Sequence, residues 1–358
     1  MSRFLSKKHA SLVPYVPGEQ PRDMQYVKLN TNESPYPPSP AVIAAAAAEA
    51  GRMNLYCDPE CTELRKKAAA LYGVRPENIL PVNGSDEILY LAFLAFGDED
   101  HPIAFPDISY GFYPVYADLL HIPAHVVPLK KDLSIDPADY RGLNETIVLA
   151  NPNAPTGRAL SPEEVESIVA SDPDRVVVID EAYIDFGGVS CVPLIEKYEN
   201  LLVTQTFSKS RSLAGGRLGF GIGCESLIRD LTTLKYSVNP YNVNRMTQAA
   251  GCAAIDDNDY YMENARTIIE TREYTARALE ELGFTVLPSK ANFLFAESPA
   301  ISGADLYAAL KQRGVLVRHF AKDRIDNFTR ITVGTREQMD ILLDNIRAIL
   351  NDKGGSPA

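Results

Sequence analysis

The sequence has few cysteines, and their spacing argues against a metal site. Five cysteines are scattered along the 358 residues, and Cys57 and Cys61 form the one closely spaced pair. No second pair of Cys or His follows at the spacing of a zinc finger, so we expect no structural metal. Free thiols in a reducing compartment are the simpler interpretation, and we therefore expect a cytoplasmic protein.

Basic residues and long apolar runs are also scarce. Lys and Arg total 35 against 47 Asp and Glu, a formal net charge of −12 that argues against a nucleic-acid partner. The alanine-rich run at residues 41–50 is shorter than the roughly 18 apolar residues of a membrane-spanning helix, and Gly51 and Arg52 follow it. The first residues lack the apolar core of a signal peptide. We expect no membrane span.

The order of sequence patterns predicts three parts of unequal size. Prolines interrupt any long element in residues 1–28, which we expect to form an arm that packs with the smaller domain. Helical and strand patterns alternate through residues 29–245, as in a large α/β domain with a mostly parallel central sheet. One long helical region at residues 245–282, then short strands and a last helix, predict a smaller α+β domain over residues 246–358.

Polar side chains follow three nearly all-apolar runs, at residues 146–150, 175–180 and 201–207. Such runs are typical of strands that are buried on both faces of a parallel sheet. Because ligands of open α/β sheets bind beyond the carboxyl ends of the strands, we expect these side chains to converge on one site. They are Asn151, Asn153, Asp180, Tyr183, Ser208 and Lys209.

Lys209 follows a predicted buried strand, which is an unusual place for an ammonium group because burial removes its hydration. Formation of a Schiff base would consume the amine and relieve that cost. Ser208 and Arg217 lie close enough in sequence to hold a phosphate, the arginine through a bidentate contact. On this segment alone, a solvated lysine at a strand end remains the alternative.

Asp180 is predicted at the end of a buried strand, where a lone carboxylate is costly. A protonated pyridine nitrogen would be a suitable cationic partner, and Tyr183 could donate to a phenolate oxygen of the same ring. An aspartate that caps a turn is the alternative at this position.

Gly84, Ser85 and Asp86 lie at the start of a helix predicted over residues 85–96. Free backbone N–H groups and the positive end of the helix dipole make such a helix start a phosphate site. Ordinary capping by Ser85 explains the pattern equally well, and the two roles are compatible.

Taken together, these motifs resemble the fold-type I pyridoxal-phosphate-dependent aminotransferases, and among them the histidinol-phosphate aminotransferases. No single segment decides the resemblance, but the order in which the segments occur makes a chance match improbable. The matching segments are residues 14–18, 29–36, 84–87, 151–157, 180–183, 208–209, 213–217 and 330–335.

The resemblance implies pyridoxal 5'-phosphate as the cofactor and assigns a role to each matching position. Lys209 would carry the cofactor as a Schiff base and, once released, act as the general base. Asp180 would pair with the ring nitrogen, Tyr183 would contact the ring oxygen O3′, and Tyr110 would stack on the ring. Further cofactor contacts would come from Gly84, Ser85, Asp86, Thr206, Ser208 and Arg217.

The resemblance also implies a homodimer and an anion-binding substrate site. Tyr56 would reach the cofactor phosphate of the neighbouring subunit, so that the active sites are shared. Arg330 and Arg318 would bind the anionic groups of the substrates, with Arg324 as a possible third cation; a surface salt bridge is the alternative for Arg318. Tyr15 and Asn32 are further candidate substrate contacts.

The loop at residues 151–157 departs from the family pattern at Ala154. The family loop usually carries Asn before Pro-Thr-Gly, where its side chain contacts O3′, but this chain has Ala154 there. Either the contact is lost, or a shift of the loop lets Asn153 or Asn151 supply it. Asn153 is the candidate that we retain as a cofactor contact.

The implied reaction is transamination from histidinol phosphate to 2-oxoglutarate, a step of histidine biosynthesis. Two other reactions on the same fold remain open from the sequence. The amino donor could be an aromatic or another amino acid, or the chain could be a threonine-phosphate decarboxylase. A scaffold without cofactor is disfavoured by the full set of cofactor residues.

Overall fold

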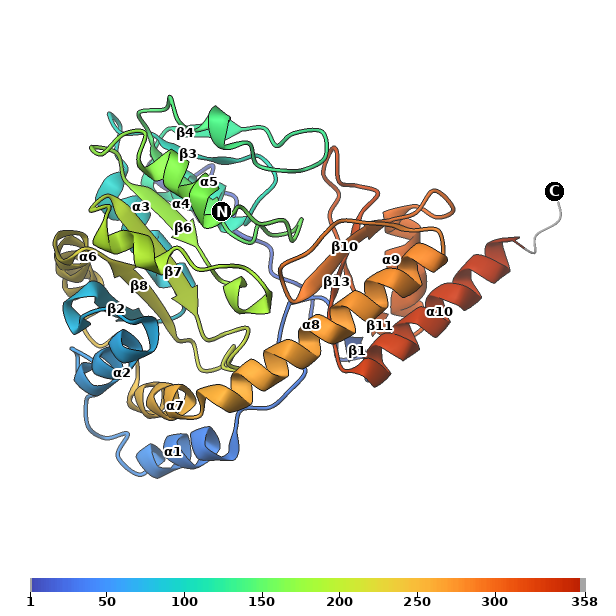
Figure 1. Ribbon diagram of the computed structural model, residues 1–358, viewed down its shortest axis with the longest axis horizontal. Helices are drawn as coiled ribbons and strands as arrows, with labels where there is room; N and C mark the ends of the chain where they lie inside the picture. The colour runs from blue at the N-terminus through green and yellow to red at the C-terminus, as the bar shows by residue number, and fades with distance from the viewer. Residues whose placement is uncertain (1, 355–358) are drawn as a thin grey trace.

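The computed structural model describes residues 2–354, and its larger unit is built around one seven-stranded, mostly parallel sheet (Figure 1). The strands are β2 (Ile79–Val82), β3 (Ile103–Pro106), β4 (Ala124–Val127), β5 (Thr146–Ala150), β6 (Val177–Asp180), β7 (Leu201–Thr206) and β8 (Gly219–Gly223). They lie in the order β2-β8-β7-β6-β5-β3-β4, and β8 alone runs antiparallel to its neighbours. The expected α/β class is confirmed.

Apolar side chains of the central strands alternate between two cores. Ile147 and Leu149 belong to the core on one face of the sheet, and Val148 and Ala150 belong to the core on the other. Because both faces are covered, these strands are apolar at most positions. The helices of this unit are α1 (Pro40–Ala50), α2 (Thr62–Tyr72), α3 (Ser85–Phe96), α4 (Phe112–Leu120), α5 (Pro162–Val169), α6 (Glu225–Val238) and α7 (Arg245–Asp256).

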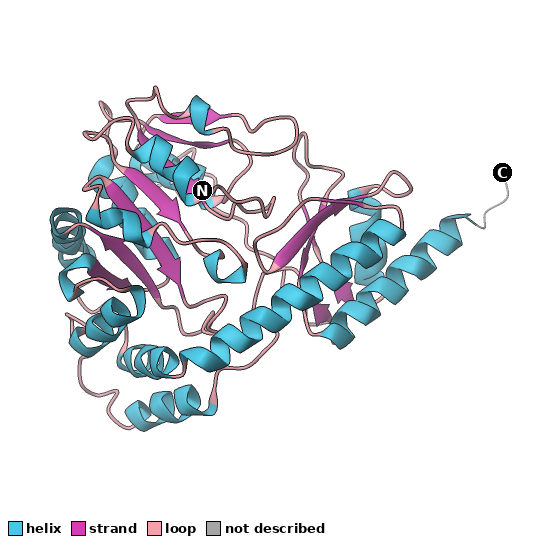
Figure 2. Cartoon of the chain, viewed as in Figure 1, coloured by secondary structure: helices cyan, strands magenta, loops and turns pink. Residues whose placement is uncertain are grey.

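The smaller unit is an antiparallel sheet packed against helices (Figure 2). Its strands are β9 (Thr285–Val286), β10 (Phe293–Glu297), β12 (Arg318–His319) and β13 (Thr329–Thr332), in the order β12-β13-β10-β9. Its helices are α8 (Asn258–Glu281), α9 (Gly303–Gln312) and α10 (Arg336–Gly354). Short 3-10 helices occur at Lys7–His9, Pro76–Asn78, Pro137–Asp139, Ile184–Phe186 and Val192–Glu196.

The long helical region expected at residues 245–282 consists of the two helices α7 and α8. The chain breaks at Asp257, whose φ of −100° and ψ of 32° lie outside the α-helical region. Helix α8 then runs from the large unit to the small one (Figure 1). Its Tyr261 belongs to the core of the large unit and its Ala265 to that of the small unit. The chain therefore changes from the core of the large unit to that of the small unit within α8, later than residue 245.

The N-terminal residues contact both units: the ring of His9 lies 5.5 Å from that of His121 in the large unit, whereas later arm residues lie along the smaller unit. Strand β1 (Val27–Lys28) pairs in parallel with β11 (Val315–Leu316). Farther toward the N-terminus, the carboxylate of Glu19 forms an ion pair with Lys311 on α9. Within the described residues, no helix has the length and hydropathy that are needed to cross a membrane.

Candidate active site

The carboxyl ends of β5, β6 and β7 meet at a cavity of about 170 Å³. It opens into a larger cavity of about 870 Å³, which also reaches the N-terminal arm and the small unit. The convergence of these strand ends was expected, because parallel strands present their carboxyl ends at one edge. The predicted residues that line the inner cavity are Ser85, Asp86, Tyr110, Asp180, Tyr183, Thr206, Ser208, Lys209 and Arg217.

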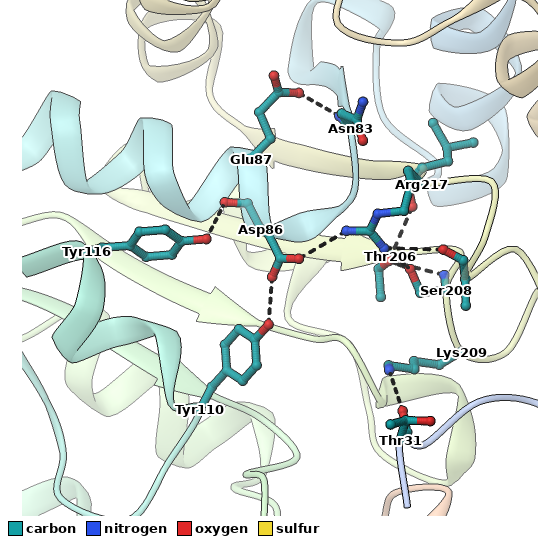
Figure 3. A network of polar contacts seen from close by, with 12 residues as sticks. Thr31, Asn83, Asp86, Glu87, Tyr110, Tyr116, Thr206, Ser208, Lys209 and Arg217 are labelled. Atoms are coloured by element: carbon teal, nitrogen blue, oxygen red, sulfur yellow. Dashed lines mark hydrogen bonds and ion pairs between the residues drawn. The ribbon is translucent and has the colours of Figure 1, made fainter. Parts of the chain in front are cut away.

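Lys209 lies one turn beyond β7 and points into the inner cavity. Its Nζ donates to the carbonyl oxygen of Thr31 at 3.4 Å (Figure 3). The same atom lies 5.7 Å from the centre of the Tyr183 ring. In the part of the chain that the structure describes, no carboxylate forms an ion pair with it. The amine is therefore partly buried and lacks a described carboxylate partner. This environment differs from that expected for a solvated lysine at a strand end.

Asp180 is the last residue of β6 and is 4% exposed. Its carboxylate accepts hydrogen bonds from the hydroxyls of Tyr113 and Thr204, each at 3.1 Å. Burial raises the pKa of Asp180 from its ordinary 3.8 to about 6, although these hydrogen bonds oppose the rise. A buried carboxylate with hydroxyl partners and no described cation fits a pyridinium nitrogen. Sequence analysis missed Tyr113 and Thr204, although a threonine within an otherwise apolar run was a signal.

Gly84 and the start of α3 form a cradle beside Arg217. Gly84 has a φ of +76°, and a Cβ atom there would lie 2.4 Å from the Arg217 guanidinium. No described side chain caps α3, so its first N–H groups face the cavity unblocked. Ser208 lies on the opposite side, where its hydroxyl accepts from Thr206 at 2.9 Å. These residues fit a phosphate at a helix N-terminus.

Asp86 connects the cradle to the tyrosines of the cavity (Figure 3). Its carboxylate pairs with Arg217 at 3.0 Å and accepts from the hydroxyl of Tyr110 at 2.7 Å. Arg217 also donates to the Ser208 hydroxyl at 3.4 Å, so its guanidinium already faces the cradle. Burial and the Asp86 carboxylate raise the pKa of Tyr110, which stays protonated and is held beside the cavity.

Asn153 does not face the cavity, which corrects the expectation that it contacts the cofactor ring. Its amide donates to the Ile108 carbonyl and to the Thr156 hydroxyl, both at 3.0 Å, and accepts from Ser109 at 2.8 Å. The amide of Asn151 is likewise engaged, with the backbone of Leu160. The polar groups of both side chains already have partners inside the protein. Ala154 lines the inner cavity in their place.

Arg330 is the main cation of the outer cavity. Its Nη2 donates to the Asn30 carbonyl at 3.0 Å, and its guanidinium lies 5.5 Å from the ring centres of Phe293 and Phe320. Its Nε is buried without a partner among the described residues. Burial lowers the pKa of Arg330, because desolvation disfavours the charged form. A half-buried guanidinium that lines a cavity without a described carboxylate partner is suited to an anionic ligand.

Arg318 and Arg324 have different surroundings. Arg318 donates to the carbonyls of Val16 and Pro17 at 3.3 and 3.4 Å and lines the outer cavity, and no described carboxylate pairs with it. Arg324 instead pairs with Asp107 at 2.8 Å and is not in the cavity lining. The possible inclusion of Arg324 in the cationic cluster was therefore wrong, because the large unit already neutralises its charge.

The other two candidate substrate residues both line the outer cavity. Tyr15 stacks on Phe112 with ring centres 4.2 Å apart. Asn32 is 1% exposed, and its amide donates to the hydroxyl of Tyr183 at 2.9 Å. Asn32 thus touches a predicted cofactor residue, and its contact with substrate stays a prediction.

Tyr56 is far more exposed than the other predicted site residues. It is 78% exposed, stacks on Tyr241 at 4.4 Å, and does not line either cavity. Met53 and Leu55 beside it are also exposed apolar side chains. A single chain therefore does not bring Tyr56 to the site that contains Lys209.

Comparison with known proteins places the chain among transaminases. The family model "Aminotransferase class I and II" matches residues 24–346. The histidinol-phosphate aminotransferase of Brachyspira hyodysenteriae is 49% identical over 98% of this chain and all of its own length. Histidinol-phosphate aminotransferase 1 of Bradyrhizobium diazoefficiens is 52% identical, again over 98% of this chain and all of its own length.

Solved structures share the fold at lower identity. A histidinol-phosphate aminotransferase of Sinorhizobium meliloti, solved with pyridoxal-5'-phosphate, has a TM-score of 0.83 at 24% identity, over 92% of each chain. An L-threonine-O-3-phosphate decarboxylase of Porphyromonas gingivalis has a TM-score of 0.80 at 20% identity, over 90% of this chain and 99% of its own. At these identities the likeness shows the fold, which does not by itself separate a transaminase from a decarboxylase.

Proposed function

The chain belongs to the class I and II aminotransferase family, and from this premise we propose that it transfers the amino group of histidinol phosphate to 2-oxoglutarate. Relatives at about half identity and over nearly the full length carry that name. The observation that carries the proposal is the half-buried guanidinium of Arg330, which lacks a described carboxylate partner and lines the cavity that also contains Lys209. This arrangement suits a small substrate with an anionic end and an amino group.

Pyridoxal phosphate, when bound, supplies a ring that withdraws electrons from the amino-bearing carbon of the substrate. Lys209 would hold it covalently and then take a proton from that carbon through Nζ. Asp180 would keep the ring nitrogen protonated, and the Tyr183 hydroxyl would donate to O3′. The start of α3, Ser208 and Arg217 would bind the phosphate.

The outer cavity would bind two different anions in turn. Arg330 and Arg318 would hold the phosphate monoester of the donor and then a carboxylate of the oxo acid. A guanidinium forms bidentate contacts with both groups, which an ammonium cannot do. Tyr15 of the N-terminal arm lines the same cavity. Its side chain would help to enclose the bound donor between the arm and the large unit.

A screen of amino donors tests the substrate. The holoenzyme is mixed with histidinol phosphate or phenylalanine, and conversion of the cofactor to its amino form is followed by absorbance. We expect histidinol phosphate to react much faster. Equal or faster reaction of phenylalanine contradicts the proposed donor, and carbon dioxide release from threonine phosphate without any oxo acid would favour the decarboxylase.

Arg330→Lys tests the anion site within the same assay. The variant keeps the positive charge but loses the bidentate geometry of the guanidinium. Because a charged hydrogen bond is worth about 1.5–3 kcal/mol, its loss should raise KM for histidinol phosphate about 10- to 100-fold. Arg313→Lys is the matched control, because Arg313 forms a surface pair with Asp352. An unchanged KM in Arg330→Lys would remove Arg330 from the substrate site.

We also infer a homodimer in which each site borrows Tyr56 from the partner. The inference is supported by the exposed aromatic and apolar side chains around Tyr56, which a partner would cover. Refolding a mixture of Lys209→Ala and Tyr56→Ala chains tests it. With shared sites, a mixed dimer has one complete site, so activity recovers to about one quarter of wild type. No recovery above the Tyr56→Ala homodimer, or a monomeric wild type, contradicts the inference.

A further inference from the structure

Tyr183 is the predicted partner of the cofactor oxygen O3′, and Ala154 leaves it without the usual asparagine beside it. The two asparagines that could replace that side chain, Asn151 and Asn153, are engaged elsewhere. We propose that Asn32 is a positioning residue that aims the hydroxyl proton of Tyr183 at O3′. The proposal rests on the function proposed above, namely that the cofactor ring occupies the Lys209 cavity.

The orientation of the Asn32 amide follows from its hydrogen bonds to Thr332. The backbone N–H of Asn32 donates to the Thr332 hydroxyl at 2.9 Å. That hydroxyl has one proton, and it goes to the Asn32 carbonyl oxygen Oδ1, also at 2.9 Å. The amide NH₂ of Asn32 is thereby turned to Tyr183, whose hydroxyl oxygen lies 2.9 Å away.

The direction of that bond determines what Tyr183 can do. A phenol has one proton to donate, and here its oxygen is used as an acceptor from Asn32. Among the described residues, no acceptor takes the Tyr183 proton in return. Tyr183 lines the same inner cavity as Lys209, so its proton is free for a ligand oxygen in that cavity.

The backbone at residue 32 favours asparagine as well. Asn32 has a φ of 55°, in the left-handed region, which asparagine and aspartate tolerate better than other residues with a side chain. Its carbonyl accepts from the side chain of Asn292 at 3.0 Å. The residue lies between β1 and α1, and its partner Thr332 lies on β13 of the small unit. The small unit therefore helps to orient a cofactor residue of the large unit.

Asn32→Asp is a close test because aspartate has nearly the same shape and tolerates the same φ. Its side chain only accepts hydrogen bonds, so it would take the Tyr183 proton away from O3′. A hydrogen bond to O3′ favours the deprotonated form of the bound cofactor, and its loss raises the pKa of the chromophore. We expect the midpoint of the absorbance titration to rise by about one pH unit.

The test is an absorbance titration of holoenzyme variants against pH. Asn32→Asp and Thr332→Val should both raise the midpoint, whereas Thr332→Ser, which keeps the hydroxyl, should titrate as wild type. In a Tyr183→Phe background, Asn32→Asp should add no further shift, because both changes act through one bond. Adding Ala154→Asn to Asn32→Asp should lower the midpoint again, by restoring a direct donor to O3′.

Two results would overturn the proposal: an unchanged midpoint in Asn32→Asp, or an equal shift with and without the Tyr183 hydroxyl. A purely structural role of Asn32 changes the thermal unfolding midpoint but leaves the titration midpoint in place. Failure of the underlying function would be seen separately: the visible band of the wild-type protein would then persist in the Lys209→Ala variant.

Discussion

Replacing Lys209 with alanine is expected to remove the visible band of the lysine-bound cofactor and to lower turnover by at least about 10²- to 10⁴-fold, the range that a general base contributes. The covalent link and the proton acceptor are lost together, because both depend on the same Nζ atom. Within the described residues, the one hydrogen bond of its Nζ, to the Thr31 carbonyl, is long at 3.4 Å, so the fold should lose little stability.

The measurements are steady-state turnover of histidinol phosphate and an absorbance spectrum of each purified variant. Lys66→Ala on the exposed side of α2 is the matched control and should behave as wild type. Lys209→Arg keeps a positive charge but cannot form the covalent link, and it should be as inactive as Lys209→Ala. Near-normal rates in either Lys209 variant contradict the assignment.

Replacing Asp180 with asparagine is expected to lower kcat/KM by about 10²- to 10⁴-fold, because breaking a buried ion pair costs about 3–5 kcal/mol. The amide keeps the shape of the carboxylate and can still bond to Tyr113 and Thr204. It cannot hold a proton on the ring nitrogen, so the ring withdraws electrons less strongly. A kcat/KM within a few fold of wild type would show that Asp180 is not the partner of the ring nitrogen.

In the apoprotein, Asp180→Asn should not lower the free energy of unfolding, although it lowers the activity of the holoenzyme. Burial raises the pKa of Asp180 in the folded chain to about 6, above its ordinary 3.8. Between these values the folded state holds a proton that the unfolded state has lost, so the free energy of unfolding falls as pH rises. Above about pH 6 the folded chain carries the full cost of the buried charge. At pH 8 the apo variant should therefore be at least as stable as wild type in a denaturant titration.

The sequence predicted those parts of the fold that local patterns control. The strand at Thr146–Ala150 and the helix at Ser85–Phe96 have the predicted bounds, because an all-apolar run and a glycine before a polar helix start are local signals. Lys209 and Asp180 were placed correctly at the cavity for a related reason. Asp180 ends a predicted strand and Lys209 closely follows another, and the parallel order of the strands brings their ends together.

Side-chain orientation was not predictable in the same way, because it depends on partners far away in sequence. Asn153 turns from the cavity toward Ile108, and Arg324 is neutralised by Asp107, in another unit of the protein. The contact between Asn32 and Tyr183 likewise joins distant segments. No local pattern specifies such pairs.

The most direct measurement of the central claim is the position of the cofactor on the chain. Borohydride reduction of the holoenzyme adds hydrogen across the imine and fixes the cofactor to its lysine, and peptide mass mapping then locates that lysine. We predict a phosphopyridoxyl group on the peptide that contains Lys209, and its absence from the Lys209→Ala protein. Labelling of a different lysine, or of none, in active wild-type protein would contradict the account.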